Sequence, residues 1–289
     1  MHTADAAGWG EFVAGLDLFL DPMLCSAVAG LVLGYLGVYI VLRRMVFVSA
    51  AITHSAGLGV ALAFYGQLHL GGHWITSPVL GAFVFGLGAT LVASLDPERL
   101  RLTRESVIGL VFVFSSGAAL LVGDRIAQES HDIHSILFGT AVMVSKGDLY
   151  GTLAVGGLTL AVHLWLRRGL VYTSFDEQSA RVQLLPVRLL NGLLLLSIGL
   201  MVSVTTRALG ALPVFAFSVL PAMAALRVSR RVQVAFVAAA VLGALAALCG
   251  YVLSFFLRFP VGATQTVLAA VFAGAGMLLG RAPRLHAHH

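Results

Sequence analysis

The sequence predicts an all-α membrane protein, a polytopic transmembrane helical bundle of about nine spans. Composition is the first reason, because 59% of the 289 residues are hydrophobic, only 11% are charged, and the mean hydropathy is +0.95. Soluble domains carry about 25% charged residues, so this composition excludes a soluble enzyme. The second reason is a series of apolar runs of about 20 residues, the length that crosses a bilayer as a helix.

These apolar runs fill most of the chain, so we expect residues 1–289 to form a single membrane domain. Besides the spans, this domain is expected to contain an outer interfacial segment at 1–19, a cytoplasmic loop at 167–188 and a cytoplasmic tail at 281–289. The predicted spans are residues 20–42, 47–68, 76–95, 106–123, 148–166, 188–206, 209–226, 232–256 and 261–280.

The connections between the runs alternate in charge, which is the third reason. Most of the 18 basic residues fall in every second connection, in short clusters that begin with Arg43 and Arg44. Positive residues mark the cytoplasmic side. We therefore expect the N-terminus outside, the C-terminus inside, and a multi-pass protein of the cell (inner) membrane rather than a nucleic-acid-binding surface.

The N-terminal region and the first span are the first elements in order. Residues 9–20 have apolar side chains at helical spacing with acids between them, which predicts a short interfacial helix on the outer face. Gly30, Gly34 and Gly37 give the first span a small-residue face suited to close helix contact. Cys25 and Cys249 lie in apolar runs and are predicted to be packing residues.

The second span carries one ionisable group, His54, among small and polar residues. Such a group inside lipid usually faces a bundle interior or a wet cavity, so His54 marks a candidate pathway, lined by Ser49 and Thr53. The alternative is a histidine that only joins two helices by a hydrogen bond. Ser115, Ser116 and Gly117 interrupt the apolar run at 106–123, as in a helix that lines a cavity.

Histidines also gather in the predicted outer connections. His69 and His73 lie four residues apart and suit a cation such as zinc only if that segment is helical; solvated loop histidines are the alternative. His131, Asp132 and His134 form the densest outer set of potential ligands. The run at 136–144 that follows them is too short to cross, so it is expected to be re-entrant or interfacial.

The longest inner connection, residues 167–188, predicts a short amphipathic helix. Thr173 or Ser174 would cap it and Pro186 would end it. Phe175, Val182 and Leu185 would form an apolar stripe without lipid to cover it, which favours docking of a partner protein. The alternative is a helix lying flat on the lipid surface.

The span at 209–226 contains Gly210, Pro213 and Pro221. Prolines inside a span free backbone carbonyls, so this segment is predicted to kink. Kinked helices often flank a translocation path, where they take part in gating, and a static packing kink is the alternative.

Several features of energy-converting and catalytic proteins are absent from the sequence. No P-loop is present, since the single lysine, Lys146, follows Ser145 rather than glycine. No predicted span contains an acid, so a carboxylate proton relay is missing. No span holds a catalytic motif, so an enzyme is not expected, and uphill transport would draw its energy from another subunit.

Four segments resemble one family, the permeases of the ABC importers for zinc, manganese and iron. The segments, in the family's order within residues 18–280, are SAAITHSAGLGVAL, HSILFG, FDEQSARVQLLPVRLLN and RALGALPVFAFSVLPAMAAL. The resemblance implies a type II ABC importer-like permease that works as a homodimer with two cytoplasmic ATPases and an extracytoplasmic metal-binding protein. By the same resemblance we expect no tightly bound cofactor: the divalent metal would be cargo, and ATP would bind the partner subunit.

The resemblance also implies roles for particular residues. His54 stands where the family has its metal-path histidine. From the residues themselves, we expect the metal to be handed over at the outer set His131, Asp132 and His134, with His69 and His73 as further candidates. The segment implied to dock the ATPase contains Phe175, Asp176, Glu177, Ala180, Val182, Leu185 and Pro186.

Three positions depart from the family pattern. Ala50 replaces the aspartate one turn before His54, Leu184 stands where the docking loop usually has glycine, and Pro213 replaces an aliphatic residue. Without that carboxylate, His54 suits a borderline-soft ion better than a hard one. The sequence therefore predicts an importer of zinc ahead of manganese or iron, with an ABC permease for a metal chelate or other solute, or a stand-alone secondary transporter, as alternatives.

Overall fold

All regular structure in the described residues is helical. The computed structural model describes residues 8, 10, 12, 15–70, 77–95, 103–129 and 144–280. Its helices are α2 (Leu16–Leu42), α3 (Val46–Leu70), α4 (Pro78–Ser94), α5 (Arg104–Glu129), α7 (Lys146–Trp165), α8 (Arg167–Phe175), α9 (Glu177–Val182), α10 (Val187–Leu209), α11 (Ala211–Val228), α12 (Val232–Leu257) and α13 (Val261–Leu279).

The long helices coincide with the predicted spans. Within the described ranges, seven helices are long and apolar enough to cross a membrane, and α7 with α8 forms a further bent pair. The remaining predicted span is α4, a shorter apolar helix. The prediction of a polytopic, all-α membrane protein is therefore confirmed, while the orientation of the bundle stays a prediction.

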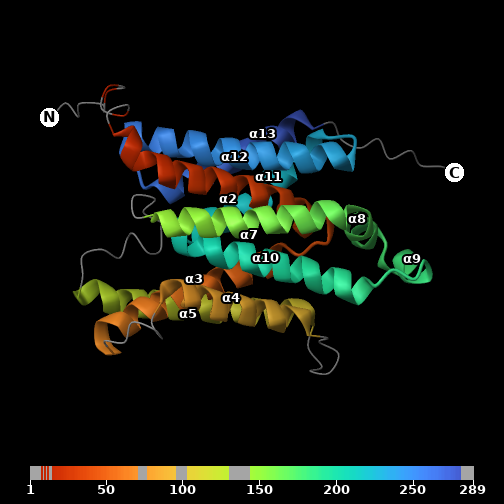
Figure 1. The fold of residues 1–289 in the computed structure, drawn as a ribbon, viewed down its shortest axis with the longest axis horizontal. Helices are drawn as coiled ribbons and strands as arrows, with labels where there is room; N and C mark the ends of the chain where they lie inside the picture. Colours follow the sequence, from red (N-terminus) through yellow and green to blue (C-terminus); the bar gives the residue numbers. More distant parts are fainter. Residues whose placement is uncertain are drawn as a thin grey trace.

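The helices form two groups joined by a middle pair (Figure 1). In one group α2, α11, α12 and α13 pack on one another, and in the other α3 packs against α4 and α5. Between them, α10 contacts α3, α4 and α7. The largest buried apolar cluster lies where α2, α10 and α11 meet. The predicted pathway helix α3 therefore lies between the middle pair and α5.

Glycines set the closest helix contacts. A Cβ atom at Gly30 would meet the backbone oxygen of Gly243, and one at Gly34 would meet that of Ala239. Both contacts join α2 to α12, so these helices approach backbone to backbone. The prediction of a small-residue face on the first span is confirmed.

The N-terminal segment differs from its prediction. Residues 16–20 belong to α2 itself, so a separate interfacial helix that runs to residue 20 is wrong. Asp17, one of the acids that suggested an amphipathic segment, lies in the first turn of α2, where the helix dipole favours a negative charge. Phe12 is buried, with ring centroids 5.1 Å from Phe255 and 6.2 Å from Phe19. Both cysteines are free.

Candidate functional site

His54 lies at the contact between α3 and α5. Its Nδ1 atom is 3.0 Å from the hydroxyl oxygen of Ser116. The ring meets Phe112 edge to face, with centroids 4.8 Å apart. The side chain is half-buried rather than enclosed. The serines that interrupt the apolar run of α5 thus face the helix that carries His54.

The other polar residues of α3 turn away from His54. Ser49 and Ser218 form a hydroxyl pair at 2.7 Å, Ser55 and Ser115 form another at 2.7 Å, and Thr53 donates to the Ser49 carbonyl. Successive residues of a helix are about 100° apart, so these side chains reach different neighbours. Ser49 and Thr53 are almost fully buried in the single chain, and their role in lining the path stays a prediction.

No carboxylate accompanies His54 in the described residues. Ala50, one turn earlier on α3, is 5% exposed and fills the position where the family has aspartate. No group of three or more His, Cys, Asp or Glu side chains that would hold a metal occurs in the described part of the chain. One imidazole and one hydroxyl per chain suit transient contact with an ion rather than a closed site.

The outer histidines are only partly described. α3 extends to Leu70, so His69 lies on the helix, its ring stacked on Tyr65 at 4.1 Å with Nδ1 3.0 Å from the Tyr65 carbonyl oxygen. His73, His131, Asp132 and His134 lie outside the described residues. A metal hand-over by this set stays a prediction.

The expectation that no span contains an acid is wrong, because a buried acid lies at the start of α7. Asp148, in the first turn of α7, is 7% exposed and forms an ion pair with Arg207 of α10. It also completes a capping box with Ser145. The Ser-x-x-Asp spacing was the sequence signal for that cap. Because its charge is paired, Asp148 joins the ends of α7 and α10 rather than standing free for a proton relay.

His163 is a second intramembrane histidine, and the sequence reasoning missed it. It lies on α7 and is fully buried, with its ring centroid 6.0 Å from that of Tyr35 and 5.5 Å from that of Tyr39. Neither ring nitrogen has a hydrogen-bond partner among the described residues. No polar neighbour in the sequence marks His163, because the rings that meet it come from α2.

The inner loop holds two short helices rather than one. The axis bends by 76° between α7 and α8, and α9 follows directly. Asp176 caps α9 by accepting from the Ser179 backbone N–H at 3.0 Å, so the expected cap by Thr173 or Ser174 is wrong. Hydrogen bonds from the Ser179 side chain and backbone lower the pKa of Asp176 below its ordinary value. α9 ends at Val182, four residues before the predicted end at Pro186, and Pro186 instead directly precedes α10, which begins at Val187.

Thr173 and Ser174 lie in the last turn of α8, and both accept hydrogen bonds from Arg43, just after the end of α2. Its Nε donates to Ser174 Oγ at 2.8 Å, and its Nη2 donates to Thr173 Oγ1 at 3.0 Å. Its Nη1 donates to Asn191 Oδ1 on α10 at 2.5 Å. One guanidinium therefore joins α2, α8 and α10 just before α3 begins.

The exposed side of this loop is apolar. Phe175 is 58% exposed, Val182 83% and Leu184 91%, while Ala180 is fully buried. Leu184 has a φ of 58°, in the left-handed region that glycine adopts most easily. That conformation explains why the family pattern has glycine there. The loop thus presents apolar side chains beyond the ends of the spans.

The three residues that predicted a kink, Gly210, Pro213 and Pro221, occupy different structural positions. Gly210, with φ of 89°, separates α10 from α11 and so is not inside a span. Pro213 is the third residue of α11, where no helical N–H bond is lost. Pro221 is inside the helix. Only Pro221 therefore removes a helical hydrogen bond, and a gating role for these residues stays a prediction.

Comparisons with known proteins agree with the resemblance in the sequence. The model of the ABC 3 transport family matches residues 16–279. The manganese import system permease protein ScaB of Streptococcus parasanguinis is 30% identical over 266 residues, covering 91% of each chain. The chelated iron transport system membrane protein YfeD of Yersinia pestis is 30% identical over 251 residues, covering 86% of this chain and 81% of its own length.

Solved structures share the fold. A chain of PsaBC from Streptococcus pneumoniae in complex with Fab matches with a TM-score of 0.78 and 26% identity, over 92% of this chain and 94% of that one. An inward-facing putative metal-chelate type ABC transporter matches with a TM-score of 0.72 at 18% identity, over 90% of this chain and 85% of that one. This second likeness concerns the fold alone.

Proposed function

The chain belongs to the ABC 3 transport family and is a multi-pass membrane permease of an ABC-type metal importer, for which we propose an ion route and a way of coupling to ATP. The ion passes His54 and leaves on the side of the bundle where α8 and α9 lie. ATP is hydrolysed by separate subunits that dock on α9. The half-buried His54–Ser116 contact between two apolar helices is the observation that carries the proposal.

A second copy of the chain would complete the path. α5 packs on α3 but leaves Val113, Phe114 and Leu121 at least 66% exposed. On the same helix, a Cβ atom at Gly109 or Gly117 would meet nothing within 4 Å. Small residues beside apolar ones suit close contact between membrane helices. A homodimer through α5 would bring two His54 imidazoles near one axis.

The donor set bears on which metal is carried. The relatives named above belong to manganese and chelated iron systems. Manganese prefers carboxylate oxygens, whereas zinc and ferrous iron bind imidazole well. Because Ala50 replaces the family's aspartate beside His54, we place zinc and ferrous iron ahead of manganese for this chain. The support for zinc is this donor chemistry alone.

A chelated metal is the second candidate. It is favoured by the relative from Yersinia pestis, whose name specifies chelated iron. A chelate brings its own ligands, so a path with one imidazole and no carboxylate would suffice for it.

The inner loop supports docking of an ATPase. Phe175, Val182 and Leu184 are exposed beyond the ends of the apolar helices, where no hydrocarbon would cover them. Asp176 and Glu177 begin α9 and leave its first turn acidic. A partner with an apolar cleft rimmed by basic groups would fit this surface.

Transport in a reconstituted system tests the function. The permease, its cognate ATPase and its metal-binding protein are placed in liposomes, and uptake of zinc, ferrous iron and manganese is measured with ATP. We expect ATP-dependent uptake with zinc or iron ahead of manganese, and a Val182→Asp variant that no longer retains the ATPase. Uptake by the permease alone under an ion gradient would instead establish the secondary transporter.

Chelated iron is offered in the same assay to separate the two candidates. Uptake of the chelate that free metal does not inhibit would favour the second candidate over the first. Strong inhibition by free metal is the result expected for an ion importer.

A further inference from the structure

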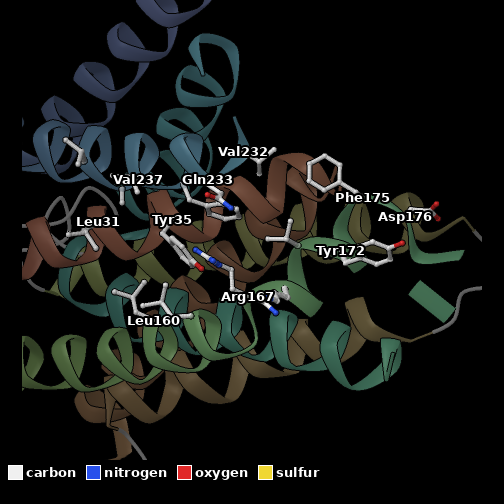
Figure 2. A pocket seen from close by; sticks show the side chains of 16 residues that line it. Leu31, Tyr35, Leu160, Arg167, Tyr172, Phe175, Asp176, Val232, Gln233 and Val237 are labelled. Atoms are coloured by element: carbon white, nitrogen blue, oxygen red, sulfur yellow. The ribbon is translucent and has the colours of Figure 1, made fainter. Parts of the chain in front are cut away.

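A pocket of about 860 Å³ lies away from the proposed ion path, between α2, α7, α8 and α12 (Figure 2). Its walls at the level of the spanning helices are apolar. They consist of Leu31, Leu160, Leu164, Phe236, Val237, Ala240 and Val241. Of these, Leu164, Val237 and Val241 are 60%, 66% and 50% exposed, so the pocket opens on the side of the bundle that faces lipid.

The end of the pocket next to α8 is basic. Arg167 and Arg168 line it together with Tyr172 and Gln233. Figure 2 shows the Arg167 side chain lying inside the pocket beside Tyr35. Neither arginine has an ion pair or a hydrogen bond to a described residue. Two unpaired cations at the end of an apolar groove suit an amphipathic ligand that has an anionic group at one end and an apolar chain at the other.

One acid, Asp176, also lines the pocket, where its negative charge could offset the two arginines. Its carboxylate accepts from the backbone N–H of Ser179 at 3.0 Å and from the Ser179 hydroxyl. In Figure 2 this carboxylate points away from Arg167. Its charge is therefore directed at α9 and does not neutralise the arginines.

The depth of the arginines matches a lipid headgroup. Only Leu166 separates them from Trp165, the last residue of α7, which is 85% exposed. Exposed tryptophans collect at the boundary between hydrocarbon and headgroups. Basic pockets between membrane helices at that level bind anionic headgroups.

We infer that this pocket is a binding site for an anionic phospholipid, with its phosphate on Arg167 and Arg168 and an acyl chain along Leu164, Val237 and Val241. This goes beyond the proposed transport function. The leaflet is the one on the side of α8 and α9. A second copy of this chain is less suited to the pocket, because α5, where we place the dimer contact, lies on the opposite side of the bundle (Figure 1).

Native mass spectrometry of the purified full-length chain in detergent tests this site. The chain is titrated with phosphatidylglycerol, or with phosphatidylcholine as the neutral comparison, and the bound lipid is counted. We expect phosphatidylglycerol to bind more tightly than phosphatidylcholine. The double variant Arg167→Gln/Arg168→Gln should weaken it about fivefold for each arginine removed. The matched variant Arg188→Gln/Arg230→Gln, two exposed arginines outside the pocket, should leave binding unchanged.

A second pair of variants tests the apolar wall and keeps both arginines. Val237→Trp fills the pocket and should abolish the tightest phosphatidylglycerol binding, whereas Val234→Trp, 52% exposed on the same helix but outside the lining, should not. Equal loss in the two arginine variants, or no effect of Val237→Trp, would reduce the site to general surface charge. Loss of the dimer or of the ATPase with Val237→Trp, at unchanged lipid binding, would overturn the proposal in favour of a protein occupant.

Discussion

His54 on α3 and His163 on α7 both lie inside apolar helices, but their surroundings are opposite. His54 is half-buried, bonds Ser116 and lies beside a helix with a largely exposed face. His163 is fully buried, touches the rings of Tyr35 and Tyr39, and has no described hydrogen-bond partner. An ionisable residue inside a membrane is a functional hypothesis by default. Here the default fits His54, whose ring an ion can approach, and not His163, whose ring is enclosed.

The helix packing around each histidine differs in the same way. Near His163, α2 and α12 cross at glycines that leave no room for a Cβ atom. Near His54, a Cβ atom at Gly57 would lie 3.5 Å from the Ala211 Cβ, an ordinary contact. We conclude that the α2–α12 crossing is closed to any added side chain, whereas α3 has room for a methyl group at Gly57, where it faces the start of α11. The close backbone contact of α3 is with α4, where a Cβ atom at Gly59 would meet the backbone oxygen of Gly81.

Replacing His54 gives the largest expected effect. His54→Ala removes the imidazole that the described residues place on the proposed path, and we expect metal uptake to fall about a hundredfold, equivalent to about 2.8 kcal/mol at ~1.4 kcal/mol per tenfold change. Uptake at limiting metal by the reconstituted transporter measures it. Unchanged uptake would remove the functional distinction between the two histidines.

Filling the α2–α12 crossing should have the next largest effect. Gly243→Ala places a Cβ atom against the Gly30 backbone, and we expect the free energy of unfolding to fall by about 2 kcal/mol, typical of overpacking. Gly57→Ala, beside His54, is the matched control and should cost nothing measurable. Thermal unfolding in detergent compares the two variants, and equal losses would contradict the difference in space between Gly243 and Gly57.

Replacing His163 should raise stability. His163→Phe keeps the ring and removes two buried nitrogens without partners, so we expect the free energy of unfolding to rise by about 1 kcal/mol. Uptake should stay within about twofold of the wild type. A loss of uptake as large as that expected for His54→Ala would show that His163 belongs to the ion path.

The smallest effect is expected at Ser116. Ser116→Ala removes the one described hydrogen bond to the His54 ring, and a net bond of about 0.5–1 kcal/mol predicts a two- to fivefold rise in the metal concentration for half-maximal uptake. Ser115→Ala is the matched control, because Ser115 pairs with Ser55 rather than His54. Equal shifts in both variants would mean that α5 packing, not the imidazole, is being measured.

Local sequence patterns predicted the features that depend on neighbours along the chain. The apolar runs located the long helices, and the position of His54 among small residues singled it out. The sequence did not reveal His163's enclosure, the Asp148–Arg207 pair or the bonds of Arg43. Their partners lie far away in the chain: Arg43 and Asn191, for example, are 148 positions apart. Helical periodicity says which face a residue is on, but not which helix meets it.

The three hydrogen bonds of Arg43 have a mechanical consequence. Only Arg44 and Met45 separate Arg43 from the first residue of α3, and Arg44 turns the chain with a φ of 55°. A displacement of α8 would therefore carry the base of α3 with it. His54 is the ninth residue of that helix, about 12 Å along its axis at ~1.5 Å per residue. We expect a nucleotide-driven movement of α8 to tilt α3 as a rigid helix. The His54 imidazole would then be displaced without any unwinding of α3.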